Sequence, residues 1–216
     1  MNGALKIKVC GMRDPANIAA VSALKPDYLG FIFFPGSRRF VGPDPETLFS
    51  QITADPGIVR TGVFVDESPE VILDHARRFQ LGAVQLHGGE SPAVCSQLLA
   101  AGLEVIKAFG VGETFDFGRL DPYRDACTYF LFDTKTSGHG GSGRAFDWSL
   151  LDGYTGDRPF FLSGGVGPEN IGALQNISSR YFYGTDLNSR FETEPGLKDT
   201  DRLRLAFTTL KSSSNI

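Results

Sequence analysis

Short apolar runs alternate with helical patterns along the whole chain, and this alternation most constrains the fold. About eight runs of strand length occur in the 216 residues, at 5–10, 28–34, 58–65, 82–87, 103–109, 128–132, 159–163 and 180–184. The run from Tyr28 to Phe34 is almost wholly apolar, which is typical of a strand buried on both faces of a parallel sheet. Strands that alternate with helices indicate an α/β protein.

The first run and the segments between the runs carry local signals of their own. Leu5 to Cys10 alternates apolar and basic residues, which predicts a half-buried strand ending at Cys10 and Gly11. Asp14 followed by Pro15 is a typical helix start, with an acidic N-cap and proline in the first turn. Similar patterns predict helices at 14–24, 44–53, 68–79, 91–101 and 199–210, the last capped by Asp199.

Eight strands mostly followed by helices predict a single-domain (β/α)8 TIM barrel over residues 1–216, with a flexible tail at 212–216. The connections after the fifth and sixth strands, 112–125 and 146–151, have poor helical periodicity, so we expect shortened or irregular helices there. A doubly wound open sheet explains the same alternation. That fold usually has fewer strands, and no G-x-G-x-x-G motif follows the first run.

Composition and charge narrow the classes of function. A net charge of -4 provides no basic surface for nucleic acid. No apolar run approaches the roughly 20 residues that span a bilayer, and the first residues lack the apolar region of a signal peptide, which favours the cytoplasm. The three cysteines and three histidines show no metal-ligand spacing, so no metal site is predicted.

In a (β/α)8 barrel the active site lies at the carboxyl ends of the strands, and polar residues follow most of the predicted strands. These candidates are Cys10, Arg38, Arg39, Asp66, Gln85, His87, Lys107, Asp133, Lys135, Ser163 and Asp186 to Arg190. Arg38 and Arg39 suit a substrate carboxylate, although a solvated basic turn is the commoner explanation. His87, Lys107 and Asp66 are as readily structural.

Cys10 and Asp133 are candidates for a base and an acid on facing sides of one pocket. Asp133 follows an apolar strand, a setting that suits a carboxyl group to donate a proton. A thiol acts as a base when nearby cations lower its pKa. A lone aspartate is more often a cap or an ion-pair partner, and a lone cysteine is more often buried apolar filling. The glycine-rich segment 137–144 is a candidate for a loop that closes over a ligand.

Gly164 and Gly165 follow the seventh strand and favour phosphate binding. Paired glycines let backbone N–H groups face an anion, and Pro168 is predicted to begin a helix with a positively polarised N-terminus. Ser189 and Arg190, after the eighth strand, could complete the site. The alternatives are a plain tight turn and a solvated arginine.

Several motifs in the same order resemble the phosphoribosylanthranilate isomerase family from Lys8 to Asp199. The matching stretches are Lys8–Met12, Gly30–Phe33, Ser37–Val41, Gly62–Val65, Val84–Gly88, Phe132–Lys135, Gly140–Gly143, Phe146–Trp148, Leu162–Gly165 and Pro195–Asp199. The resemblance implies an intramolecular isomerase of tryptophan biosynthesis. Its reaction would be the Amadori rearrangement of N-(5-phosphoribosyl)anthranilate to 1-(2-carboxyphenylamino)-1-deoxyribulose 5-phosphate, without metal or cofactor.

The resemblance also implies roles for individual residues. Cys10 matches the general base, Asp133 the general acid and Arg39 the arginine that binds the anthranilate carboxylate. The loops that match Gly164 with Gly165, and Asn188 with Ser189 and Arg190, hold the phosphate. Many members carry a small residue at the position of Arg190, which leaves open the groups that contact the phosphate.

His87, Lys107 and Asp186 remain further substrate-site candidates. The alternatives are a non-catalytic barrel that binds phosphosugars and another phosphosugar enzyme, such as indole-glycerol-phosphate synthase or a pentose-phosphate epimerase. We expect a small phosphorylated substrate as the partner, no nucleic acid or membrane, and either a monomer or a homodimer.

Overall fold

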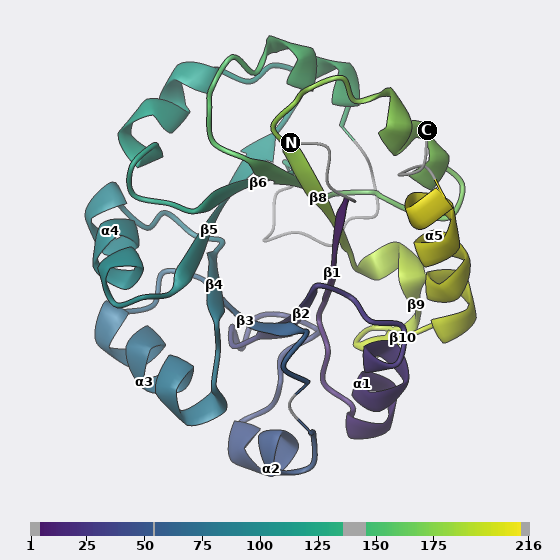
Figure 1. The fold of residues 1–216 in the computed structure, drawn as a ribbon. Coiled ribbons are helices and arrows are strands. Elements are labelled where there is room, and N and C mark those ends of the chain that lie inside the picture. The colour runs from purple at the N-terminus through teal and green to yellow at the C-terminus, as the bar shows by residue number, and fades with distance from the viewer. Residues whose placement is uncertain (1–4, 54, 136–145, 213–216) are drawn as a thin grey trace.

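The computed structural model describes residues 5–53, 55–135 and 146–212, and within these ranges eight parallel strands form a closed barrel (Figure 1). The strands pair in sequence order, and β8 returns to β1 with Ile7 opposite Thr185. Helices surround the ring of strands, and the last helix lies beside the first (Figure 1). The predicted (β/α)8 fold is confirmed.

Each apolar run predicted from the sequence overlaps a strand of the barrel. The strands are β1 Lys6–Cys10, β2 Tyr28–Ile32, β3 Val59–Phe64, β4 Ala83–Leu86, β5 Glu104–Val111, β6 Tyr129–Thr134, β7 Phe160–Leu162 and β8 Phe182–Leu187. The ends of β6 and β8 lie further along the chain than predicted. Asp133 and Asp186 therefore belong to strands and not to the loops after them.

The first four helices begin as their sequences predict, with an Asp or Ser N-cap followed by proline. They are α1 Pro15–Ser22, α2 Pro45–Ser50, α3 Pro69–Phe79 and α4 Pro92–Ala100. In α1, the side chain of Asp14 accepts a hydrogen bond of 2.8 Å from the backbone N–H of Asn17. Each such cap is typically worth about 1 kcal/mol of helix stability. Helix α2 ends at Ser50, before the predicted Thr53.

The second half of the barrel has short 3-10 helices in place of α-helices. They are η1 Phe117–Tyr123 after β5, η2 Trp148–Gly153 after β6 and η3 Ile171–Asn176 after β7. The first two confirm the predicted irregular connections, but the helix predicted from Pro168 is wrong. Asn170 closes a turn there, since its Oδ1 accepts from the Gly167 N–H at 2.8 Å and its Nδ2 donates to the Gly165 carbonyl at 2.8 Å.

The chain after β8 forms a small unit that the sequence did not predict. It comprises η4 Ser189–Phe191 and an antiparallel hairpin of β9 Glu192–Glu194 and β10 Leu197–Lys198. Helix α5 Thr200–Ser212 then packs against α1. Asp199 caps α5 as predicted, because its Oδ1 accepts from the N–H groups of Asp201 and Arg202 at 3.1 Å each. The rest of the predicted tail, 213–216, and the predicted loop 137–144 lie outside the described residues.

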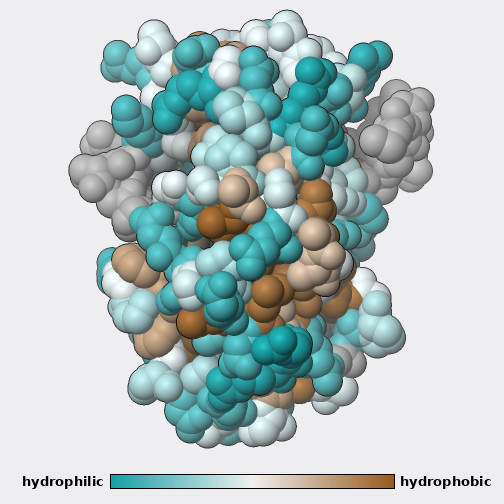
Figure 2. Space-filling view, turned by 90° about the vertical axis from the view of Figure 1, so that its left-hand side faces the viewer, coloured by the Kyte–Doolittle hydropathy of each residue, from teal (hydrophilic) through white to brown (hydrophobic). Residues whose placement is uncertain are grey.

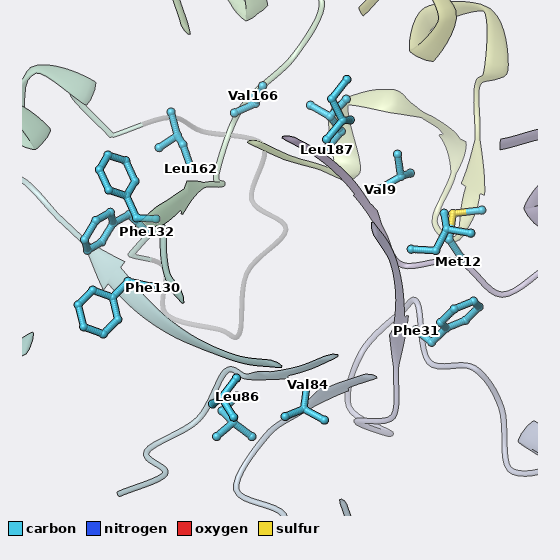
Figure 3. Packing of buried hydrophobic residues seen from close by; sticks show 14 of the residues in the cluster. Val9, Met12, Phe31, Val84, Leu86, Phe130, Phe132, Leu162, Val166 and Leu187 are labelled. Atoms are coloured by element: carbon cyan, nitrogen blue, oxygen red, sulfur yellow. The ribbon is translucent and has the colours of Figure 1, made fainter. Parts of the chain in front are cut away.

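Side chains alternate along each strand between an outer core under the helices and the barrel interior. Phe130 and Phe132 of β6 point outward into the larger core, whereas Leu131 between them belongs to a second, inner cluster (Figure 3). Burial of each phenylalanine contributes roughly 1.5–3 kcal/mol. Asp133, next along β6, consequently points inward with Leu131.

Strand β1 follows the same alternation, with a polar inner face. Ile7 and Val9 are 1% and 0% exposed in the outer core, and Lys8 and Cys10, on the opposite face, are also buried, at 0% and 2%. The prediction of a half-buried strand is therefore wrong. The period of two is real, but the polar face lies inside the barrel and not in solvent.

The side of the molecule that carries α3 and α4 is mainly hydrophilic, with apolar residues scattered across its middle (Figure 2). Among the described helices, none is both long and apolar enough to cross a membrane.

Candidate active site

A pocket opens at the carboxyl ends of the barrel strands, where seven strands or the loops after them contribute side chains. It is lined by Cys10, Ile32, Phe34, Ser37, Arg39, Val63, Val65, Gln85, His87, Asp133, Ser163, Gly164, Gly165, Val166, Asp186, Asn188 and Ser189. Most of the site residues predicted from the sequence are therefore brought together. The lining combines apolar side chains with polar groups, which is typical of small-molecule sites.

Cys10 and Asp133 line this pocket from β1 and β6, two strands that are not neighbours in the barrel. They are 2% and 7% exposed. Gly30 on β2 makes room for the thiol, because a Cβ at that position would lie 2.6 Å from Cys10 Sγ. The structure thus gives the pocket a buried thiol and a buried carboxyl group on separate walls.

The charge state of Cys10 depends on burial and on two lysines. Burial raises the pKa of the Cys10 thiol, while the positive charges of Lys8 and Lys198 act in the opposite direction without cancelling it. In the ligand-free site the thiol is therefore protonated near neutral pH. A lowered pKa was expected for a thiol that acts as a base, and the net shift is in the opposite direction. The nearby cations that were expected to lower the pKa are present.

Lys8 and Asp186 form a fully buried ion pair inside the barrel near Cys10. Lys8 Nζ donates to Asp186 Oδ1 at 3.0 Å, and the two side chains are 0% and 4% exposed. Burial alone would lower the pKa of Lys8, but the charge of Asp186 and its hydrogen bond raise that pKa above its ordinary value. Burial raises the pKa of Asp186 despite the lysine. Lys8 therefore carries a positive charge into the floor of the site.

Within the part of the chain that the structure describes, the Asp133 carboxyl group contacts the Thr134 backbone and the His87 ring. Its Oδ1 accepts from the Thr134 N–H at 2.8 Å, and its Oδ2 lies 3.4 Å from His87 Nε2. Gln85 Nε2 lies 2.9 Å from His87 Nδ1. These contacts connect Asp133 through the His87 ring to Gln85.

Arg39 lines the opposite part of the pocket and is bound from behind by Glu192 of the hairpin. Arg39 Nε lies 2.9 and 3.1 Å from the two carboxylate oxygens of Glu192, and Nη2 lies 2.7 Å from Oε2. Lys198 Nζ donates to Glu192 Oε1 at 2.5 Å and to Asn188 Oδ1 at 2.7 Å. Burial would raise the pKa of Glu192, but these cations hold it below its ordinary range. Burial lowers the pKa of Lys198.

Gly164 and Gly165 form a tight turn with positive φ angles of +78° and +72°. A Cβ at Gly164 would come within 2.6 Å of Asp133 Oδ1 and nearer still to the Thr134 amide, so only glycine fits. Asn188 and Ser189 lie at the end of the next strand, and both residues line the pocket. Backbone and hydroxyl donors thus border this part of the pocket, although the predicted helix N-terminus is not there.

Five of the polar candidates predicted from the sequence do not line the pocket: Arg38, Asp66, Lys107, Lys135 and Arg190. Lys107 is 2% exposed, and its Nζ donates to the carbonyls of Leu86, Gly88 and Ala108 while it pairs with Glu90 at 3.2 Å, which ties the end of β4 to β5. Arg190 pairs with Glu169 of the loop after β7, and both side chains are partly exposed.

Lys8, Glu192 and Lys198 surround the site but were not predicted from the sequence. For Lys8 a signal was available, since residues two apart on a strand share a face and Cys10 was already a candidate. Glu192 and Lys198 depend on the hairpin, which is too short to show a pattern.

A closed (β/α)8 barrel with a thiol, a carboxyl group, an arginine and a glycine turn in one pocket at the strand ends is typical of TIM-barrel enzymes that act on small molecules. Comparison with known proteins narrows this class. The model of the N-(5'-phosphoribosyl)anthranilate isomerase family matches residues 7–209, and the chain belongs to this family.

Individual relatives agree with this assignment over nearly their whole lengths. The N-(5'-phosphoribosyl)anthranilate isomerase of Parabacteroides distasonis is 46% identical over 198 residues, which cover 92% of this chain and 90% of that protein. The crystal structure of phosphoribosyl anthranilate isomerase from Thermotoga maritima has a TM-score of 0.82 and 37% identity, covering 96% of this chain and 99% of the other.

A third relative was solved with a ligand. It is a phosphoribosyl anthranilate isomerase in complex with reduced 1-(o-carboxyphenylamino)-1-deoxyribulose 5-phosphate, with a TM-score of 0.81 and 34% identity. The match covers 96% of this chain and 99% of that one.

Proposed function

We propose that this pocket catalyses the Amadori rearrangement of N-(5-phosphoribosyl)anthranilate to 1-(2-carboxyphenylamino)-1-deoxyribulose 5-phosphate. The chain belongs to the isomerase family of this step in tryptophan biosynthesis. The observation that carries the proposal is that Cys10 and Asp133 enter one pocket from non-adjacent strands, with Arg39 and the Gly164 turn in the same pocket.

The two anionic ends of the substrate fit two parts of the pocket. We assign the phosphate to the backbone of Gly164 and Gly165 with Asn188 and Ser189, since N–H groups of a turn at positive φ form anion-binding concavities. We assign the aromatic carboxylate to Arg39, whose guanidinium lines the pocket. The ribose then lies between them, within reach of Cys10 and Asp133. Binding both ends holds the reacting carbons in place, which lowers the entropic part of the barrier.

Asp133 acts first, as the general acid. It protonates the ribose ring oxygen, the ring opens, and the anthranilate nitrogen forms a Schiff base with C1. The carboxylate left on Asp133 accepts from the Thr134 N–H at 2.8 Å and faces His87 Nε2 at 3.4 Å. The hydrogen bond from the Thr134 N–H stabilises the charge that develops as the proton leaves, which is where preorganised hydrogen bonds accelerate a reaction.

Cys10 acts second, as the general base. The protonated Schiff base makes the C2 proton acidic, and the thiolate removes it to give an enolamine that tautomerises to the ketone. Because burial raises the pKa of Cys10, the thiolate depends on the charges of Lys8 and Lys198 that oppose this shift. Asp186 lines the same pocket and pairs with Lys8, so it fixes the position of that charge.

Loss of anthranilate fluorescence tests the proposal. Freshly made N-(5-phosphoribosyl)anthranilate mixed with the purified protein should lose its fluorescence with turnover, and EDTA should leave the rate unchanged. Binding of the reduced product analogue without turnover would favour a non-catalytic phosphosugar barrel. Loss of activity in EDTA would favour a metal-dependent sugar-phosphate enzyme.

We further propose that the enzyme works in the cytoplasm, as a monomer or a homodimer, on a small phosphorylated substrate and without nucleic acid. Its three cysteines are free buried thiols, which suits a reducing compartment. The net charge of -4 disfavours binding to nucleic acid. Light scattering during gel filtration tests the oligomeric state.

A further inference from the structure

Glu192 on β9 is a buried carboxylate that the proposed mechanism does not use. Its side chain is 4% exposed, and it lies directly behind a residue that lines the pocket. Its two oxygens accept from Arg39, from Lys198 and from the Gly196 N–H, at distances of 2.5 to 3.1 Å. Charge-assisted hydrogen bonds from these donors fix the position of the Glu192 carboxylate, and they fix the donor groups as well.

The contacts of Arg39 with Glu192 determine which edge of the guanidinium a ligand can reach. Glu192 occupies Nε and one side of Nη2, so the edge formed by Nη1 and Nη2 is left for a ligand in the pocket. Among the described residues, the hydrogen bonds of the Arg39 side chain involve only Nε and Nη2. We infer that Glu192 is a positioning residue, which turns this edge of Arg39 toward the pocket and thereby sets where the substrate's aromatic carboxylate binds. The inference rests on the proposed role of Arg39.

Gly11 makes this placement of Arg39 possible from the other side. A Cβ at Gly11 would lie 2.7 Å from Arg39 Cδ and 3.0 Å from Asn188 Oδ1. The arginine stem therefore lies against bare backbone, while its head is bound by Glu192. With both ends fixed, the guanidinium has little freedom to follow a misplaced ligand.

Lys198 connects the same carboxylate to the proposed phosphate side of the pocket. Its Nζ bridges Glu192 Oε1 and Asn188 Oδ1, and Asn188 lines the pocket beside Ser189. With Lys198 and Arg39 both charged, two cations surround one carboxylate, which leaves one positive charge for an anionic ligand. Glu192 thus fixes the arginine and, through Lys198, the side chain of Asn188.

Calorimetric binding of two ligands separates this role from a purely structural one. The first ligand is reduced 1-(o-carboxyphenylamino)-1-deoxyribulose 5-phosphate, and the second is its phenylamino counterpart without the carboxylate. We expect Glu192→Gln to weaken binding of the first ligand roughly 10- to 100-fold, because a displaced guanidinium loses a well-aligned contact. Binding of the second should change less than about twofold. In turnover, KM should rise more than kcat falls.

The matched control is Glu194→Gln, two residues further along β9 with an exposed side chain. It should leave both affinities and KM within about twofold of the wild type. If Glu192→Gln does not fold, Glu192→Asp keeps the charge but draws the carboxylate back, and the same selective loss is expected.

Equal weakening of both ligands, or unchanged binding of the first by a folded Glu192→Gln protein, would overturn the inference and leave the proposed function standing. A wild-type protein that bound neither ligand would overturn the proposed function itself.

Discussion

Single residues in the site are constrained by close contacts that leave little room for substitution. Gly11 combines a φ of +79° with a hypothetical Cβ position 2.7 Å from Arg39 Cδ. Gly30 and Gly164 similarly border Cys10 and Asp133. Each of these glycines lies beside a residue that we assign to substrate binding or catalysis. A larger side chain at any of the three positions would change the shape of the pocket.

Gly11→Ala should therefore weaken substrate binding as well as the fold. The left-handed backbone costs a non-glycine residue roughly 1–3 kcal/mol, and the added methyl group must also displace the arginine. We expect KM to rise about 10- to 100-fold, with a smaller change in kcat. Steady-state kinetics alongside thermal unfolding measure both effects. A lowered melting temperature with unchanged KM would show that Arg39 had not moved.

Asp133→Asn removes the proposed acid and keeps the shape of the side chain. We expect kcat to fall by about 10²- to 10⁴-fold, with little change in affinity for the reduced product analogue. Fluorescence kinetics measures kcat, and calorimetry measures the affinity for the reduced product analogue. A variant that turns over at the wild-type rate would exclude Asp133 as the acid.

The reactivity of Cys10 should rise with pH into the alkaline range. Its pKa is raised from 9.0 by burial, so the reactive thiolate is scarce at pH 7 and increases as the pH passes through that raised value. Iodoacetamide labelling of the ligand-free protein, followed by mass spectrometry, gives the rate at each pH. Cys10→Ser measures the background from Cys95 and Cys127. Rapid labelling at pH 7 that levels off below pH 8 would contradict the assigned direction.

At the scale of elements, the sequence predicted what depends on local pattern. The N-caps before α1 to α4 and the apolar runs of the strands are local signals, and they located these elements correctly. The helix predicted from Pro168 does not form, because the side chain of Asn170 closes a competing turn. The β9–β10 hairpin was missed because strands of three and two residues carry no detectable period.

The hairpin should contribute a pH-dependent part of the stability through Glu192. Its pKa is held below the ordinary 4.5, so the carboxylate stabilises the fold above pH 4.5 and loses that contribution as the pH falls through the lowered folded-state pKa. The difference in unfolding free energy between wild type and Glu192→Gln should therefore be largest above pH 5 and shrink on acidification. Urea unfolding at several pH values tests this. A difference that grew toward low pH would reverse the assigned sign.

At the scale of the whole molecule, barrel closure brings distant residues together. Lys8 and Asp186 lie 178 positions apart in the sequence, yet their side chains are 3.0 Å apart because β8 pairs with β1. The order of the strands and the approximate position of each strand end could be predicted, so Cys10, Asp133 and Arg39 were placed at one rim. The partners behind them, Glu192 and Lys198, could not, because their positions follow from the closed barrel and the hairpin together.

Barrel closure also buries the polar face of β1, which the sequence pattern had placed in solvent. A period of two shows that the two faces of a strand differ in polarity, but it does not show which face is exposed to solvent. In this barrel the outer face meets helices and the inner face meets other strands, so both faces of β1 are buried.

The rate of N-(5-phosphoribosyl)anthranilate fluorescence loss with Cys10→Ala tests the central claim most directly, with Cys95→Ala as the control. Cys95 is also a buried cysteine, but it lies on α4 in the outer core and away from the pocket. We predict that Cys10→Ala lowers kcat by about 10²- to 10⁴-fold and that Cys95→Ala retains the wild-type rate. Turnover by folded Cys10→Ala within about twofold of the wild type would contradict the assignment of Cys10 as the base.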